Sequence, residues 1–351
     1  MTSTTIFILF FIYTTVFGLF THRFFVIRAE KYKIKKANTS AERWSSQTKP
    51  ILGGLSFYVI FLFSIINLMF LFDIESLLKA EVLGSILVIT ISFLMGLADD
   101  MLNTPPGFKF IFQLLCAGIL IYSGIYIDIF STPIYNYILT VFWVVGIMNS
   151  INMIDNMDAI SSSVAISILI GSTFLMLFTK GFSPFYIILS IGGLAGLVSF
   201  LYYNWHPAKM YMGDNGSQFL GALLAIIGIV CFWNAPTMQN HSNLYPFIFA
   251  FFAFIVPISD TTTVTINRLL KGQSPFVGGR DHTTHHLSYF GLSERKVAIL
   301  LFSINLFFVF VAVSIIILAE NMIVPIWVFG VLGIMVLLSL YSITKISKPK
   351  S

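Results

Sequence analysis

A pair of adjacent carboxylates, Asp99 and Asp100, follows a long apolar run, and Lys109 comes shortly after it. Two neighbouring carboxylates at the boundary of an apolar segment repel each other unless a cation or a proton relieves the repulsion. The pair therefore suits a site that binds a cation or handles a proton. An ordinary acidic helix end in water is the alternative, and these residues alone favour neither interpretation.

Residues 149–158 concentrate oxygen-bearing side chains of the kind that Mg²⁺ prefers. They are those of Asn149, Asn152, Asp155, Asn156 and Asp158. Asn149, Asn152 and either Asp155 or Asn156 recur at a spacing of three to four residues, which places side chains on one face of a helix. The competing interpretation is an Asn-rich helix cap with solvated acids, but this density of polar groups is unusual in so apolar a chain.

A third polar stretch, residues 204–217, contains the glycine-flanked acid Asp214. Glycines beside an acid allow the backbone to approach a ligand closely, and a helix that starts here would present amide groups that favour anions. Tyr211, three residues earlier, offers an aromatic face for stacking. Taken in isolation, the stretch is equally typical of a simple turn and helix cap.

A long polar loop, residues 268–296, carries Arg280, His282 and His285 beside paired glycines. Arginine and histidine suit a polyanion such as a diphosphate. The histidine spacing also permits zinc, but no thiolate joins it and the acids are elsewhere in the sequence. We therefore favour a diphosphate site, with a plain solvated loop as the alternative.

These stretches interrupt a chain that is too apolar for an ordinary soluble domain. Of its 351 residues, 57% are hydrophobic and 10% are charged, a balance that one soluble core could not accommodate. Crossing a bilayer takes about 20 apolar residues, and the repeated runs predict an all-α polytopic membrane protein with one domain over residues 1–351. The eleven expected spans are 3–22, 51–72, 82–98, 109–127, 134–150, 159–179, 184–203, 215–233, 245–267, 297–319 and 322–344.

The basic residues predict the orientation of these spans. If all eleven runs cross, 18 of the 20 Lys and Arg fall on one side, and only Lys79 and Lys180 fall on the other. Because cytoplasmic loops are enriched in positive charge, we expect the N-terminus outside and the C-terminus in the cytoplasm of a cell (plasma or inner) membrane. Topology thus explains the basic charge, and no nucleic acid partner is expected. All four polar stretches then face the cytoplasm.

Oxygen ligands for Mg²⁺, cationic groups for phosphate oxygens and a lipid-embedded frame together describe phosphoryl transfer between a soluble nucleotide and a lipid. An ion-coupled secondary transporter is the main rival from another class. It predicts acids near the bilayer midplane and an inverted repeat. Neither is apparent in the sequence, where only Asp260 is even modestly embedded. A non-catalytic lipid-binding scaffold would not need four polar clusters on one face.

In their order along the chain, the polar stretches resemble those of the polyprenyl-phosphate N-acetylhexosamine-1-phosphate transferases, a group within glycosyltransferase family 4. The matching segments are 50–54, 96–100, 149–158, 204–216, 257–268 and 280–292. Members of this family start cell-envelope polysaccharides such as O-antigen and teichoic acid, and the muramoyl-pentapeptide transferase is a more distant member. Ordered coverage of this kind is more specific than any single motif.

The resemblance implies roles for individual residues. These are Asp99, Asp100, Lys109, Asp155 and Asp158 as catalytic, with the Asp99–Asp100 pair near the lipid phosphate; Asp214 and Asn152 as metal ligands; Tyr211 beside the uracil; and Arg280, His282 and His285 at the donor diphosphate, in a cytoplasmic substrate-binding loop over residues 268–296. It also implies Mg²⁺ as cofactor, with Mn²⁺ as an acceptable substitute, and is compatible with a homodimer.

The implied reaction transfers N-acetylhexosamine-1-phosphate from a UDP-sugar, with UDP-N-acetylglucosamine as first choice, to undecaprenyl or another polyprenyl phosphate. The lipid phosphate attacks the β-phosphorus and UMP is released. No obligatory general base is needed, because the second pKa of a phosphate monoester is roughly 6. Proton removal by Asp99 and a two-step route through an aspartyl intermediate both stay open.

Two segments depart from the family pattern. Residues 155–159 read Asp-Asn-Met-Asp-Ala where many members have Asp-Gly-x-Asp-Gly, which removes the glycines that permit a tight backbone approach. Thr284 replaces the middle histidine of a His-x-His-His pattern. Neither change removes an expected metal ligand. The loop also differs from that of the muramoyl-pentapeptide enzymes, so a simple UDP-N-acetylhexosamine is the favoured donor and a muramoyl-pentapeptide-type reaction is the alternative.

Overall fold

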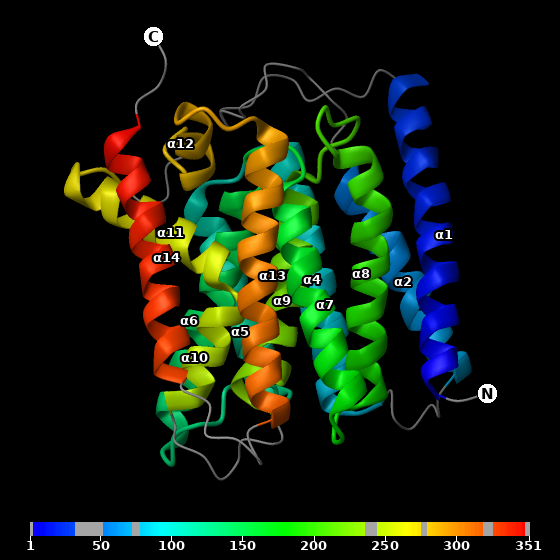
Figure 1. Ribbon diagram of the computed structural model, residues 1–351. Helices are drawn as coiled ribbons and strands as arrows, with labels where there is room; N and C mark the ends of the chain where they lie inside the picture. The colour runs from blue at the N-terminus through cyan, green and yellow to red at the C-terminus, as the bar shows by residue number, and fades with distance from the viewer. Residues whose placement is uncertain are drawn as a thin grey trace.

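The structure, a computed structural model, describes residues 3–31, 52–71, 78–235, 244–274, 279–318 and 326–347. Every regular element in these ranges is helical, which confirms the all-α prediction (Figure 1). The helices are α1 (Ser3–Lys31), α2 (Gly53–Leu71), α4 (Ala80–Leu102), α5 (Pro106–Tyr122), α6 (Pro133–Ile154), α7 (Ile160–Phe178), α8 (Pro184–Asn204), α9 (Gly213–Gly228), the π-helical turn η1 (Ile229–Trp233), α10 (Leu244–Ala253), α11 (Ile255–Leu270), α12 (Thr283–Tyr289), α13 (Glu294–Leu318) and α14 (Ile326–Ile346).

Within the described residues, nine helices are long and apolar enough to cross a membrane. Two of the eleven expected spans take another form: α5 has only 17 residues, and residues 245–267 lie in the bent pair α10 and α11. Every expected span thus coincides with a helix or helix pair, and the chain is a polytopic membrane protein. Helix α1 begins and α14 ends at opposite ends of the bundle (Figure 1), whereas the side that faces the cytoplasm stays a prediction.

The expectation of one continuous span over residues 245–267 is wrong. Helix α10 ends at Ala253, and α11 runs on at 87° to it. Pro257 explains the break, because proline lacks an N–H and its ring clashes with the carbonyl four residues earlier, which here is that of Ala253. Asn305 of α13 compensates for the break: its Nδ2 donates to the Ala253 carbonyl (3.1 Å), and its Oδ1 accepts the N–H of Val256 (3.2 Å).

Helix α9 lies at the centre of the bundle, buried along its length and packed on α2, α4 and α6. Two glycines let neighbouring helices reach its first turn. A Cβ at Gly96 of α4 would collide with the carbonyl oxygen of Asp214, and a Cβ at Gly54 of α2 would collide with the side chain of Asn215. These contacts hold the start of α9 against the backbones of α2 and α4.

Prolines set the starts of two helices that carry site residues. Pro106 and Pro133 begin α5 and α6, where the missing N–H costs nothing because the first turn of a helix leaves its N–H groups unpaired. Lys109 therefore lies in the first turn of α5, and Asn152 lies in the last turn of α6. Since α6 runs antiparallel to α5 and α9, the end of α6 meets the starts of the other two.

Candidate active site

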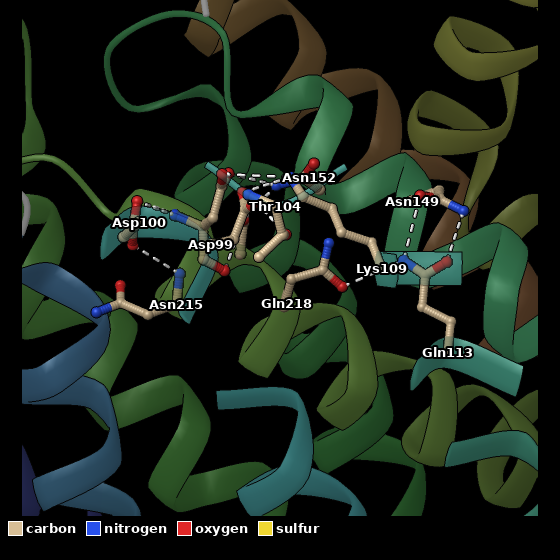
Figure 2. Close-up of polar contacts among 11 residues, drawn as sticks. Asp99, Asp100, Thr104, Lys109, Gln113, Asn149, Asn152, Asn215 and Gln218 are labelled. Atoms are coloured by element: carbon tan, nitrogen blue, oxygen red, sulfur yellow. Dashed lines mark hydrogen bonds and ion pairs between the residues drawn. The ribbon is translucent and has the colours of Figure 1, made fainter. Parts of the chain in front are cut away.

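The ends of four helices bring sequence-predicted residues together (Figure 2). Nζ of Lys109 lies 2.5 Å from Oδ2 of Asp99 and 3.4 Å from Oδ2 of Asp214, so one ammonium group contacts carboxylates from α4 and α9. Nδ2 of Asn152, at the end of α6, donates to Oδ1 of Asp214 at 2.8 Å. The backbone N–H of Thr104 donates to Oδ1 of Asp99 at 2.9 Å. We call Asp99, Lys109, Asn152 and Asp214 the charged layer.

Asp100 holds the start of α9. Its two carboxylate oxygens accept the backbone N–H groups of Asp214 (3.2 Å) and Asn215 (3.0 Å). The first N–H groups of a helix have no partner within the helix and carry partial positive charge, so an acid there stabilises the helix end. Asp100 is thus placed to position Asp214, whereas its neighbour Asp99 contacts Lys109.

The charged layer fits a divalent cation with oxygen ligands. Asp99 and Asp214 already share one cationic neighbour, Lys109, and 27% of the Asp214 side chain is exposed, which leaves a path from solvent. Asn152 presents its amide nitrogen to Asp214 and also donates it to Oγ of Ser217 at 2.8 Å. Its carboxamide would have to rotate before its oxygen could bind a metal. Asp214 is therefore the better placed of the two predicted ligands.

One helical turn deeper, three carboxamides from α5, α6 and α9 form a second layer. We call Gln113, Asn149 and Gln218 the amide layer. Gln113 and Asn149 exchange hydrogen bonds of 2.9 and 3.2 Å, and Nε2 of Gln113 also donates to Oε1 of Gln218 at 3.3 Å (Figure 2). Gln113 and Gln218 are fully buried. Gln113 and Gln218 follow Lys109 and Asp214 by four residues, and Asn149 precedes Asn152 by three, so each amide lies one helical turn from a charged-layer residue.

The polar loop after α11 is anchored on that helix. Asp260, fully buried on α11, lies with Oδ2 2.8 Å from Nδ1 of His282, and its Oδ1 accepts the N–H (2.8 Å) and the hydroxyl (2.5 Å) of Thr283. Arg268 forms a two-pronged contact with Asp281, at 2.8 and 2.6 Å. Helix α11, which begins after the bend, thus carries Asp260, and Asp260 fixes the position of His282.

Burial and charge set the protonation of this loop. Burial raises the pKa of Asp281, but the hydrogen bonds and charge of Arg268 outweigh it, and the pKa lies below its ordinary value. Burial lowers the pKa of His285 to about 3, and His282 acts in the same direction. His285 is therefore neutral near pH 7 and fully buried. Arg280 is exposed, so its positive charge lies at the surface of the loop.

Asp158 lies apart from the charged layer. Nδ1 of His206 is 3.0 Å from Oδ2 of Asp158 and 3.3 Å from Oε2 of Glu294, and the N–H of Ala208 donates to the same Asp158 oxygen at 2.9 Å. Among the described residues, Asp158, His206 and Glu294 are the one trio of His, Cys, Asp or Glu whose ligand atoms lie within 4.8 Å of one another. The zinc alternative at the loop histidines thus gains no support there.

Two further predicted residues, Asp155 and Tyr211, are not part of the charged layer. Asp155 directly follows α6 and is half-buried. Tyr211 is 6% exposed, and its carbonyl oxygen accepts the N–H of Gly53 at 3.1 Å. Little of its ring is open to a ligand in this structure. The metal, catalytic and substrate-binding roles assigned from the sequence stay predictions for all of these residues.

The segment from α4 to η1 matches a family model. Residues 82–232 fit that of Glycosyl transferase family 4. This segment belongs to glycosyl transferase family 4. It contains the whole charged layer and the whole amide layer, so the resemblance predicted from the motifs is confirmed at the level of the family.

Several curated relatives are similar to the chain. A "Probable undecaprenyl-phosphate N-acetylglucosaminyl 1-phosphate transferase" of Bacillus subtilis is 32% identical over 244 residues, which are 67% of this chain and 64% of that protein. A "Decaprenyl-phosphate N-acetylglucosaminephosphotransferase" of Mycobacterium leprae is 28% identical over 59% of this chain and 58% of its own. A "Phospho-N-acetylmuramoyl-pentapeptide-transferase" of Aliarcobacter butzleri is 33% identical over 52% and 60%. The chain thus spans less than two thirds of the length of each of these three relatives.

Asn149 was predicted from the sequence, but its association with Gln113 and Gln218 and the anchoring role of Asp260 were not. A signal for the first was present, because Gln113 and Gln218 lie four residues after Lys109 and Asp214, on helices whose first turns had been singled out. The sequence places Asp260 within an apolar span but indicates no partner for it. Its partners lie more than 20 residues further along the chain, and nothing in their spacing indicates the contact.

Proposed function

We propose that the chain transfers N-acetylhexosamine-1-phosphate, first of all N-acetylglucosamine-1-phosphate, from a UDP-sugar to undecaprenyl or another polyprenyl phosphate. The observation that carries the proposal is the charged layer at one end of a membrane bundle, inside a glycosyl transferase family 4 segment. The names of the Bacillus and Mycobacterium relatives support the same donor and acceptor classes. The product would start a cell-envelope polysaccharide.

In the proposed reaction, an oxygen of the lipid phosphate forms a bond to the β-phosphorus of the UDP-sugar. The bond from that phosphorus to the bridging oxygen breaks, and UMP leaves with the electron pair. A bound Mg²⁺ or Mn²⁺ would neutralise negative charge on the diphosphate. Lys109 holds Asp99 and Asp214 in place between the helix ends, and Asp100 keeps Asp214 at the start of α9.

The donor diphosphate is assigned to Arg280 and His282, with Asp260 fixing the ring of His282 from within α11. Exposed Arg280 supplies positive charge, whereas His285 is buried in α12 and neutral, so it supplies none. The proposed site faces the cytoplasm, where UDP-sugars are made. The strong bias of Lys and Arg to that side supports this orientation.

The test is an assay of the purified protein with undecaprenyl phosphate, Mg²⁺ and a panel of UDP-sugars that includes UDP-N-acetylmuramoyl-pentapeptide. The lipid product is identified by mass, and UMP is quantified. We expect N-acetylglucosamine on a lipid diphosphate, loss of activity with EDTA, and recovery with Mg²⁺ or Mn²⁺. A muramoyl-pentapeptide lipid would shift the assignment to that alternative. Uptake of sugar or ions into proteoliposomes without UMP release would replace the proposal by a transporter.

A further inference from the structure

The amide layer contains a buried donor with no protein acceptor. Gln218 is fully buried on α9, and within the described residues its Nε2 makes no hydrogen bond. Burying an amide N–H without an acceptor is costly, and such groups in folded proteins usually bind a water molecule or a ligand. The open donor of Gln218 therefore indicates a bound partner that accepts hydrogen bonds.

The geometry directs this donor towards the charged layer. Gln218 lies four residues after Asp214 on α9, and side chains on a helix lean towards its N-terminus, which places the Gln218 carboxamide below Asp214. Gln113 accepts a hydrogen bond from Asn149 through its oxygen, so its Nε2 faces Gln218 as a donor. Gln218 therefore presents its oxygen, not its nitrogen, to Gln113. Its nitrogen then points away from Gln113, towards the side on which Lys109 lies (Figure 2).

We propose that Gln218 is a substrate-binding residue whose amide N–H donates to a phosphate oxygen held at the charged layer. The inference deepens the proposed function and rests on it. Phosphate oxygens at the reacting centre accept hydrogen bonds, and both proposed substrates carry them: the UDP-sugar in its diphosphate and the lipid in its monophosphate. A neutral donor can orient such an oxygen from below, while Lys109 already engages Asp99 and Asp214.

A metal ion does not explain the open donor, because an amide N–H cannot ligate a cation. A structural water molecule is the competing occupant. It would satisfy Nε2 without any link to substrate. The two cases differ in whether changing Gln218 alters substrate binding.

The test compares two substitutions. Gln218→Leu removes the donor at similar size and leaves Gln113 its bond to Asn149. Gln218→Asn keeps an amide but retracts it by one methylene group. Asn67→Leu is the matched control, because it removes a carboxamide from α2 about 13 residues from Gly54, roughly 20 Å along the helix from the site. Each purified variant is measured by thermal shift with UDP-N-acetylglucosamine alone, by thermal shift with undecaprenyl phosphate alone, and by transfer kinetics.

We expect both Gln218 variants to fold with unchanged thermal stability and Mg²⁺ requirement and to lose about tenfold in affinity for one phosphate substrate, the size expected for one lost hydrogen bond to a charged group. Weaker binding of undecaprenyl phosphate would assign the contact to the lipid, and weaker binding of the UDP-sugar would assign it to the donor. A fall in kcat alone would assign it to the transferring phosphoryl group.

The proposal is overturned if both variants keep wild-type binding and kinetics, which is the outcome for a structural water. It is also overturned if their losses follow a changed half-saturating Mg²⁺ concentration, since Gln218 would then act through Asp214. If Gln218→Leu does not fold, Gln218→Asn decides alone. Wild-type protein that binds both substrates but transfers nothing would defeat the proposed function, while the binding measurements would still test Gln218.

Discussion

Asp214 is held by residues from three neighbouring helices. Its carboxylate meets Lys109 and Asn152, and its backbone N–H is held by Asp100. Position and charge at this residue are therefore fixed from α4, α5 and α6 together. A substitution that changes its charge but not its size separates chemistry from packing.

We predict that Asp214→Asn inserts and folds but loses about a hundredfold or more of the transfer rate, because an amide is a weaker Mg²⁺ ligand than a carboxylate and metal ions supply several kcal/mol of transition-state stabilisation. UMP release across a Mg²⁺ titration measures the effect. Asp128→Asn, in the connection between α5 and α6 at the opposite end of the bundle, is the matched control. Near-normal activity of Asp214→Asn at limiting Mg²⁺ would remove Asp214 from the metal role.

His285 predicts a pH dependence of stability. Burial lowers its pKa from 6.5 to about 3, so below pH 6.5 the unfolded chain binds a proton that the folded chain does not. Folding stability must then fall as the pH drops from 6.5 towards 3, by about 2 kcal/mol at pH 5 from this residue. His286, whose pKa burial also lowers, acts in the same direction.

In the His285→Leu variant, the unfolded chain no longer binds a proton at this position. Apparent melting temperatures in detergent between pH 7.5 and about pH 5 should therefore fall less for His285→Leu than for the wild type. An equal fall in both proteins would show that His285 is protonated in the folded state.

The polar stretches and their resemblance to the family predicted a set of site residues, and four of these lie together in the structure. These four are Asp99, Lys109, Asn152 and Asp214. The sequence was not enough to tell Asp99 from Asp100, because a helix turns neighbouring side chains about 100° apart and the choice depends on which helix packs on each. The position of Asp158 could not be predicted for a similar reason, because the connection after α8 brings its partner His206 near it.

At the level of helices, hydropathy predicted where apolar segments lie but not their direction. The α10–α11 segment is apolar enough to be read as one span, yet Pro257 breaks it. Asn305, almost 50 residues further on, forms hydrogen bonds with two backbone groups at the break, which lipid could not satisfy. That compensation depends on tertiary packing, which no local pattern contains.

The packing of α4 on α9 gives a prediction at this scale. Gly96→Ala should displace the first turn of α9, because the added Cβ would collide with the Asp214 carbonyl oxygen. Overpacking of this kind costs about 1–3 kcal/mol, and it moves Asp214 itself, so we expect at least about a tenfold loss of transfer.

Gly118→Ala on α5 is the control, because a Cβ there meets nothing within 4 Å. It should raise stability by about 0.5–1 kcal/mol through helix propensity and leave transfer unchanged. Thermal unfolding and UMP release measure both variants. Equal activity in the two would show that the α4–α9 contact tolerates a methyl group and does not set the site.

For the whole molecule, the bundle is a frame that brings distant polar stretches to one end. The charged layer comes from the ends of α4, α5, α6 and α9, and α12 lies at the same end as the close of α14 (Figure 1). Thr284 of α12 donates to Oδ1 of Asn156, two residues after α6, at 2.8 Å, which links the donor loop to the helix that carries Asn152. A transporter would place its acids near the middle of the bilayer. Here the buried Asp260 is already engaged by His282 and Thr283.

The orientation of this frame is the last prediction. Lys79 and Gln273 are both exposed, Lys79 just before α4 and Gln273 just after α11. The charge bias places Gln273 with the site in the cytoplasm and Lys79 outside. Cys116 and Cys231 are buried, so they add little background labelling. A membrane-impermeant maleimide applied to intact cells should label Lys79→Cys, and should label Gln273→Cys only after permeabilisation. Labelling of Gln273→Cys in intact cells, without labelling of Lys79→Cys, would invert the topology and place the charged layer where no cytoplasmic nucleotide sugar could reach it.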